Sequence, residues 1–345
     1  MRRLYLDEFR PVTQLVLDDN TPEAPRFPII DMHGHMGPIM LGDNYEESYD
    51  TAEQAALLRA CGVEKLVSMD LIWGESYHRM QRKLEAAADF FPIFPSVDVS
   101  DVGNPNFEKD VYNTLLSYRS DGIKGLKLWK NITLSCKAPE GGVLRPDSKW
   151  LAPVFAYAGE LGLPIVIHIA DPPPFFQANS PENEYYQCLL EHPEWSFFKP
   201  GIPGFEQHME MQEKMLEYNP GTTFVIAHVG SYSENLRQVS RWLDTYPNMY
   251  IDVAARIDQL GRQPYTAKEF LIRYQDRVLF GSDYVPDLDA VSFYGIHRRF
   301  FETPDEYFDH PFAGFLGNWK IYGVDLDDEV LKKLYRDNAI KVFGF

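Results

Sequence analysis

The chain has 345 residues, with 33 lysines and arginines against 51 aspartates and glutamates, which gives a formal net charge of -18. This acidic balance excludes a protein that binds nucleic acid through a generally positive surface, and it argues against adhesion to an anionic membrane. The apolar share of 45% and the charged share of 24% are ordinary for a globular protein in water.

Cysteine usage and the start of the chain indicate the compartment. The three cysteines, Cys61, Cys136 and Cys188, lie far apart and form neither a disulfide framework nor a CxxC metal motif. Asp7 and Glu8 interrupt any early apolar stretch that could act as a signal peptide, and no apolar run approaches the about 18 residues of a membrane span. We therefore expect a cytoplasmic protein in a reducing compartment.

Residues 1–27 come first and lack a sustained period, which predicts an arm that packs on the main domain, residues 28–345. Short apolar runs of strand length follow, each bounded by Gly, Pro, Asp or Asn. They are Phe27–Met32, Lys65–Met69, Phe91–Val97, Ile123–Trp129, Pro164–Ile169, Thr222–Ala227, Met249–Val253 and Arg277–Phe280. Such near-continuous apolar strands are typical of a parallel sheet that is covered on both faces.

Helical patterns, with apolar residues three and four apart, lie between these runs. They are Thr51–Ala60, Glu75–Phe90, Phe107–Ser120, Lys149–Leu161, Phe205–Tyr218, Glu234–Tyr246, Thr266–Gln275 and Asp327–Val342. Alternating strands and helices predict right-handed crossovers, and eight of each predict an α/β protein folded as a closed (β/α)8 TIM barrel. An open, doubly wound sheet is the alternative that the pattern leaves.

Two predicted connections are too long to be plain turns. Residues 171–204 follow the fifth predicted strand, and residues 284–325 follow the eighth. Both leave carboxyl ends of strands, where barrels build their active sites, and long loops in compact domains are usually functional. We interpret them as lids or pocket walls, with contacts in a homodimer as an alternative or additional use.

Four of the nine histidines lie at predicted strand ends: His33 and His35 at the first, His168 at the fifth and His228 at the sixth. Asp283 takes the equivalent place after the eighth strand. Alone, each has an ordinary explanation, such as a buried core histidine or a turn residue. Because all five converge on one end of one predicted barrel, they favour a functional site.

The spacing of the first pair predicts metal binding. Side chains alternate along a strand, so His33 and His35 share a face, with Asp31 one step deeper on that face. His168 and Asp283 would complete three nitrogens and one carboxylate oxygen, and a position for water would remain, as in catalytic zinc sites. His228, on a neighbouring strand, could bind that water or the substrate.

These stretches, taken together, resemble the amidohydrolase superfamily, in the branch that contains aminocarboxymuconate-semialdehyde decarboxylase-like proteins. The resemblance runs from about residue 28 to the end, through Ile30–His35, Pro164–His168, Phe224–His228, Leu279–Asp283 and Asn338–Phe343. It implies a metal-dependent TIM-barrel enzyme in which His228 is the catalytic histidine beside a metal-bound water. The implied metal ligands are His33, His35, His168 and Asp283.

Lys127, on the fourth predicted strand, has three interpretations. In two-metal relatives a lysine at this strand is carboxylated and bridges the ions. Its ammonium could instead bind a substrate carboxylate, or it could pair with an interior carboxylate such as Asp31. One Zn²⁺ is the favoured metal content, with Mn²⁺ or a second ion as open alternatives.

Arg256 follows the seventh predicted strand and could form a bidentate contact to a carboxylate. Together with Lys127 it is a candidate substrate contact, which suits a small organic acid or its derivative. The sequence contains no Walker loop, GxGxxG, HExxH or GxSxG motif.

The predicted function is hydrolysis of a small, carboxylate-bearing ester, lactone or amide through a metal-activated water. Asp283 would act as the base, and His228 would orient the water or polarise the carbonyl. Metal-dependent, non-oxidative decarboxylation of a small aromatic or unsaturated acid is the main alternative, since the same ligands would serve it. A barrel that binds metal or ligand without turnover is a third hypothesis.

Overall fold

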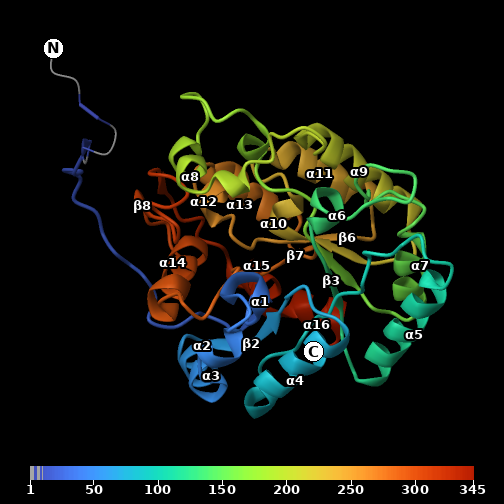
Figure 1. Ribbon diagram of the computed structural model, residues 1–345. Coiled ribbons are helices and arrows are strands. Elements are labelled where there is room, and N and C mark those ends of the chain that lie inside the picture. The colour runs from blue at the N-terminus through green and yellow to red at the C-terminus, as the bar shows by residue number, and fades with distance from the viewer. Residues whose placement is uncertain (1–3, 6–7, 10) are drawn as a thin grey trace.

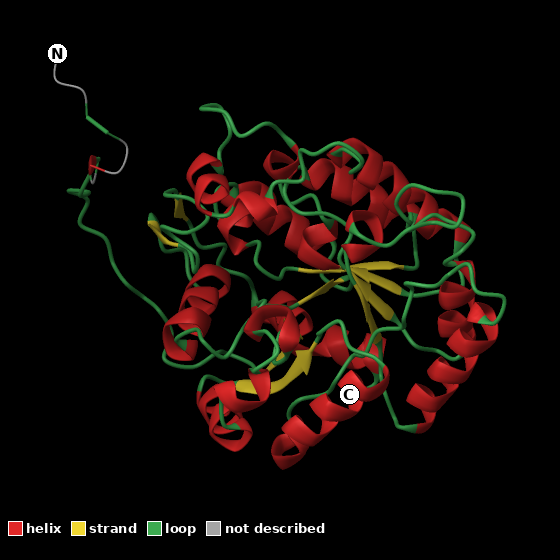
Figure 2. Ribbon diagram, viewed as in Figure 1, coloured by secondary structure: helices red, strands yellow, loops and turns green. Residues whose placement is uncertain are grey.

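Parallel strands stand at the centre of the molecule with helices around them (Figures 1 and 2). The structure is a computed structural model that describes residues 4, 5, 8, 9 and 11–345. Two runs of strands pair in parallel, β1 with β2, and β3 through β7 in chain order. Their bounds are β1 (Ile29–Gly34), β2 (Val63–Ser68), β3 (Leu126–Leu128), β4 (Ile165–Ile167), β5 (Phe224–Ile226), β6 (Met249–Asp252) and β7 (Val278–Leu279).

Backbone hydrogen bonds join the two runs into a ring. At one junction, Met32 on β1 donates to the carbonyl of Phe280, and His35 donates to the carbonyl of Tyr284. The first and last strands are therefore neighbours, as in a closed barrel and unlike an open doubly wound sheet. The TIM-barrel architecture predicted from the alternation is confirmed.

The second junction contains the third predicted strand, Phe91–Val97, which is extended but is not a regular strand. Pro92 and Pro95 have no N–H to donate, so a full ladder cannot form here. Their carbonyls still accept hydrogen bonds from Ser68 on β2 and Lys127 on β3, both at 2.9 Å. The segment thus completes the ring, and β3 to β7 correspond to the fourth to eighth predicted strands.

The main helices cover the outside of the ring, and three of them, α3, α5 and α9, have the predicted bounds. The main helices are α3 (Thr51–Ala60), α4 (Gly74–Leu84), α5 (Phe107–Ser120), α7 (Ala152–Glu160), α9 (Phe205–Tyr218), α11 (Leu236–Thr245), α13 (Pro264–Arg273), α14 (Ala290–Glu302), α15 (Asp328–Lys332) and α16 (Asn338–Phe343). A π-helical segment, η5 (Lys333–Asp337), connects α15 to α16.

Single turns complete the described helical structure. They are α1 (Pro38–Leu41), α2 (Tyr45–Ser48), α6 (Asn131–Leu134), α8 (Tyr186–Glu191), α10 (Ala227–Gly230), α12 (Ile257–Leu260), η2 (Glu85–Ala87), η3 (Pro173–Phe176) and η4 (Pro193–Trp195). No helix in the described part of the chain combines the length and the apolar character needed to cross a membrane.

Alternation along the strands separates two apolar cores. Ile165 and Ile167 on β4 belong to the large core between the ring and the helices, whereas Val166 belongs to a separate inner core. The inner core comprises Ile30, Met32, Val67, Met69, Phe94, Val166, Val225, Leu279, Ala339 and Phe343. It fills the barrel interior, with α16 supplying its last two members.

The two long connections contain more regular structure than the sequence indicated. Residues 171–204 hold η3, α8 and η4, and residues 284–325 hold α14 and a short hairpin, β8 (Phe308–Asp309) with β9 (Lys320–Ile321). The interpretation of residues 284–325 as a loop was therefore wrong. The missed signal is Asp289, whose carboxylate accepts the backbone N–H groups of Val291 and Ser292 and begins α14.

The described part of the arm packs on the barrel from Asp18 onward, which corrects the expected packing for residues 11–17, whereas residues 1–3, 6, 7 and 10 lie outside the described residues. Residues 11–17 are exposed and run away from the body, and Figure 1 shows this extended segment. Contacts begin at Asp18, whose carbonyl accepts from Arg299 on α14. Asn20 then binds Asp305 through its backbone and side chain, at 2.9 and 2.6 Å.

Replacing Phe343 by alanine tests the inner core. Phe343 is 5% exposed and packs on Phe94, with ring centroids 4.9 Å apart. The expected loss in the free energy of unfolding is about 3–5 kcal/mol, because the cavity cannot fully collapse. Urea denaturation measures it, with Tyr265→Ala, at an exposed side chain, as the control. Equal stability of the two variants would contradict the assignment of Phe343 to the core.

Candidate active site

Backbone strain gathers at the carboxyl ends of three adjacent strands. Five of the seven non-glycine residues with positive φ in the described chain lie there. They are His228 (φ 60°), Val229 (57°) and Ser231 (61°) after β5, Ala255 (48°) after β6 and Asp283 (68°) after β7. Left-handed conformations cost a side-chain-bearing residue free energy, and they concentrate at functional sites. This end of the barrel is the candidate active site.

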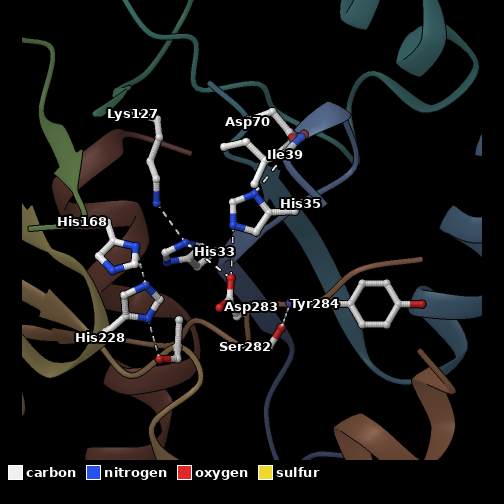
Figure 3. Close-up of polar contacts among 12 residues, drawn as sticks. His33, His35, Ile39, Asp70, Lys127, His168, His228, Ser282, Asp283 and Tyr284 are labelled. Carbon is white, nitrogen blue, oxygen red and sulfur yellow. Dashed lines mark hydrogen bonds and ion pairs between the residues drawn. The ribbon is translucent and has the colours of Figure 1, made fainter. Parts of the chain in front are cut away.

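His33, His35 and Asp283 converge at this end (Figure 3). Oδ1 of Asp283 lies 3.2 Å from Nε2 of His35 and 3.7 Å from Nε2 of His33. Both imidazoles are buried, while the Asp283 side chain is 27% exposed and so opens the cluster to solvent. Burial favours the neutral acid, but His35 and His33 outweigh it and hold the pKa of Asp283 well below its ordinary value.

Asp31 does not share a face with His33, in contrast to the expectation from strand alternation. The pairing of β1 with β2 is irregular between Asp31 and Gly34, which breaks the alternation. The carboxylate of Asp31 accepts hydrogen bonds from Ser282 and from Tyr294 on α14, at 2.6 Å for the latter. Burial is the main reason that its pKa is raised to about 6.

Asp252, at the end of β6, is a site residue that the sequence analysis did not single out. Its Oδ2 lies 2.9 Å from Nδ1 of His33, and its Oδ1 accepts from the backbone N–H of His228. The available signal was an acid inside an apolar strand, since a fully buried carboxylate needs partners. Because the carboxylate accepts a hydrogen bond from the N–H at Nδ1 of neutral His33, Nε2 of that ring carries the lone pair.

His168 and His228 contact each other, with ring centroids 4.3 Å apart, and the ring of His228 also lies 4.9 Å from that of His33. Nδ1 of His228 donates to the carbonyl of Ala254, so its Nε2 accepts from Nδ1 of His168, 3.2 Å away. Nε2 of His168 is buried and forms no hydrogen bond, although Oδ1 of Asp171 lies 3.5 Å from it. Burial, followed by the charge of Lys130, lowers the pKa of His168 to about 3. Burial also lowers the pKa of His228 well below its usual value.

Within the described residues, two groups of side chains have ligand atoms close enough for one metal ion. One is His33, His35 and Asp283, and the other is His33, His228 and Asp252. Asp252 is the weaker candidate ligand, because both its oxygens already accept N–H groups. His168 belongs to neither group, so the structure brings together three of the four predicted ligands.

Lys127 is fully buried on β3, with Nζ 2.9 Å from Nε2 of His33 (Figure 3). No carboxylate in the described part of the chain lies within 4 Å of it, so the pairing with Asp31 considered from the sequence is wrong. Burial lowers its pKa to about 8, although Asp252 and Asp283 partly compensate. An unpaired buried ammonium is costly, so Lys127 stays a candidate functional residue.

Arg256, after β6, is 8% exposed, and NH1 donates to the carbonyl of Ala255. Within the described residues it forms no ion pair. Its charge acts on His228, whose pKa it helps to lower after burial and His168. The guanidinium thus has further N–H groups that can donate hydrogen bonds to a ligand near the candidate active site.

The two long connections meet over this end of the barrel. Tyr185 of the first packs edge-on against Trp319 of the second, with ring centroids 5.5 Å apart. Trp195 and Phe315 form a similar pair at 5.3 Å. At the rim, Lys130 binds Asp171 at 2.6 Å, and its ammonium lies over the rings of Trp129 and Phe197, at 5.3 Å from each. These contacts support the interpretation of both connections as pocket walls.

Comparison with known protein families identifies the class. The family model described as Amidohydrolase matches residues 30–345, so the chain belongs to the amidohydrolase superfamily and is an enzyme of that superfamily. No curated protein shows significant sequence similarity to it.

Solved structures share the fold at low sequence identity. A 2,6-dihydroxybenzoate decarboxylase from Rhizobium has 14% identity and a TM-score of 0.56 over 92% of this chain and 99% of that one. A dihydroxybenzoic acid decarboxylase from Polaromonas sp. JS666, with bound manganese and 2-nitroresorcinol, has 12% and 0.56 over 92% and 97%. A probable 2-pyrone-4,6-dicarboxylic acid hydrolase from Acinetobacter baumannii has 13% and 0.51 over 92% and 100%.

The buried carboxylate of Asp31 predicts an unusual pH dependence of stability. Its pKa is about 6 in the folded chain and 3.8 ordinarily, so the folded state binds the proton first. Relative to Asp31→Asn, the wild type should therefore gain stability as the pH falls through 6, by about 2.4 kcal/mol at pH 4. Urea denaturation of both proteins between pH 7 and pH 4 measures the difference, and a difference independent of pH would contradict the raised pKa.

Proposed function

We propose that the protein is a metal-dependent hydrolase of a small, carboxylate-bearing ester, lactone or amide. The observation that carries the proposal is the meeting of two imidazole nitrogens with an ionised carboxylate at a partly open barrel end. His33, His35 and Asp283 form this group, and the unpartnered Nε2 of His168 supports the latter as the fourth ligand.

The donor set fits a divalent ion. Asp252 fixes Nε2 of His33 as a lone pair, and neutral imidazole with carboxylate suits Zn²⁺ as well as Mn²⁺. Two donors on one ion, at about 2.1 Å from it, lie about 3.0–3.5 Å apart. The distances of 3.2 and 3.7 Å from Asp283 to the two imidazoles are close to this range. One Zn²⁺ per chain is the proposed content.

The ion would lower the pKa of a water to about 7. Asp283, ionised and partly exposed, takes the proton of the attacking water and returns it to the leaving group. Nε2 of His228 accepts from Nδ1 of His168 in this structure, and in place of that contact it would orient the O–H of the water rather than polarise a carbonyl. Lys127 and Arg256 bind the substrate carboxylate.

Non-oxidative decarboxylation is the second candidate, and Lys127 is the observation that favours it. A buried ammonium beside His33 can hold a carboxylate or deliver a proton to carbon as carbon dioxide leaves. The similar folds of dihydroxybenzoate decarboxylases from Rhizobium and Polaromonas are compatible with this reaction. Hydrolysis remains the first proposal because Asp283, ionised and partly exposed, is placed to act as the base.

Metal content is the first test. Protein grown with zinc or manganese should contain one ion per chain by elemental analysis, and His35→Ala should lose most of it because one of the donors is removed. His78→Ala, at an exposed histidine on α4, is the matched control and should retain the ion. Two ions per chain would favour a carboxylated Lys127 instead, and a wild type without metal would refute the proposed site.

Product analysis separates the two reactions. Lactones, esters and amides are assayed for acid release, and hydroxybenzoates for carbon dioxide release. We expect acid release that falls about 10²–10⁴-fold in Asp283→Asn, because the base is lost. Asp276→Asn, at an exposed carboxylate beside Lys333, should be unaffected. Carbon dioxide release alone would establish the decarboxylase, and metal binding without either product would favour a non-catalytic barrel.

A further inference from the structure

Asp252 connects three separate parts of the site. It is the last residue of β6, and its carboxylate is fully buried. Oδ2 lies 2.9 Å from Nδ1 of His33, while Oδ1 accepts the backbone N–H groups of His228, at 2.8 Å, and Ala254, at 3.1 Å. One side chain thus holds β1 and the turns after β5 and β6.

The first of these contacts fixes the tautomer of His33. Oδ1 of Asp252 is occupied by two backbone N–H groups, and Oδ2 faces Nδ1 of His33. An ionised carboxylate can only accept, so Nδ1 of His33 carries the proton and Nε2 the lone pair. That lone pair faces Nζ of Lys127 and the carboxylate of Asp283.

The second contact holds His228 in a costly conformation. His228 has φ 60° and ψ 50°, a left-handed backbone that is sterically unfavourable for residues other than glycine. Its N–H binds Asp252, and its ring donates to the carbonyl of Ala254, whose own N–H binds the same oxygen of Asp252. Both the backbone and the ring of His228 are therefore placed by groups that Asp252 organises.

We propose that Asp252 is a positioning residue that couples the ligand tautomer of His33 to the placement of His228. This inference rests on the proposed metal site and goes beyond it, because it assigns the order of that site to a residue that touches neither substrate nor ion. In metal sites generally, such hydrogen-bond partners of ligating histidines strengthen metal binding by about 10–100-fold.

Asparagine has the same shape as aspartate but cannot do the same work. Asp252 faces N–H donors on both sides, and an amide offers an acceptor on one side only. If its NH₂ group faces His33, the imidazole must place its proton on Nε2, where it blocks metal binding. If the NH₂ group faces the other way, the N–H groups of His228 and Ala254 lose their acceptor.

The test uses Asp252→Asn with two measurements on the full chain. Nitrogen NMR of metal-free, ¹⁵N-histidine-labelled protein reports the tautomer. Wild-type His33 should be protonated at Nδ1, and the variant should show either a changed protonation site on His33 or shifted ring-nitrogen resonances of His228. Titration calorimetry with Mn²⁺ should show an affinity lower by about 10–100-fold in the variant. Asp31→Asn is the matched control, because Asp31 is equally buried but contacts no imidazole ring.

Three results would overturn the inference. They are a folded Asp252→Asn with the wild-type affinity for Mn²⁺, a wild-type His33 protonated at Nε2, and equal losses of affinity in Asp252→Asn and Asp31→Asn. If the wild type binds no Mn²⁺ or Zn²⁺, the proposed function fails, and the histidine spectra still decide the tautomer. If Asp252→Asn does not fold, the wild-type spectrum alone is the deciding measurement.

Discussion

Closure of the barrel between β1 and the segment after β7 is the constraint on which the site depends. Three backbone hydrogen bonds form this junction, from Met32 to Phe280, from Asp283 to His33 and from His35 to Tyr284. They join segments about 250 residues apart in the chain and bring the carboxylate to the histidine pair. Gly281 permits the approach, since a Cβ there would lie 2.9 Å from that of His33. Without closure, His33 and His35 would be two donors with no third.

Charge is distributed unevenly in this molecule. The chain carries a net charge of -18, yet the barrel end buries Lys127 and Arg256 without ion pairs in the described structure. Burying an unpaired cation costs free energy, and such a cost persists at sites where a ligand compensates it. A small anion is the compensating ligand that this arrangement fits, despite the acidic exterior. The same two cations would serve hydrolysis or decarboxylation, which is why the reaction must be decided by its products.

Two buried aspartates near His33 have different tasks because their strands direct them differently. Asp31 binds Ser282 and Tyr294 and so attaches β1 to α14 outside the ring. Asp252 binds His33 and His228 and orders the groups that face the proposed metal. Burial of either carboxylate costs free energy, but only Asp252 accepts a hydrogen bond from an imidazole ring. The positive φ of His228 and Asp283 shows that the fold also holds strained backbone at this end.

The sequence by itself determined the features that local patterns encode. Alternating apolar runs and helical periods specified the barrel, and His33, His35, His168, His228 and Asp283 were recognisable because each follows a strand. The tertiary structure decided which side chains meet. The irregularity in β1 turned Asp31 away, Pro92 and Pro95 left the third segment without regular pairing, and Lys127 came to lie beside His33 instead of Asp31. Asp252 gained its importance in the same way. These outcomes depend on contacts across the ring between residues far apart in the chain, and periodicity carries no information about such contacts.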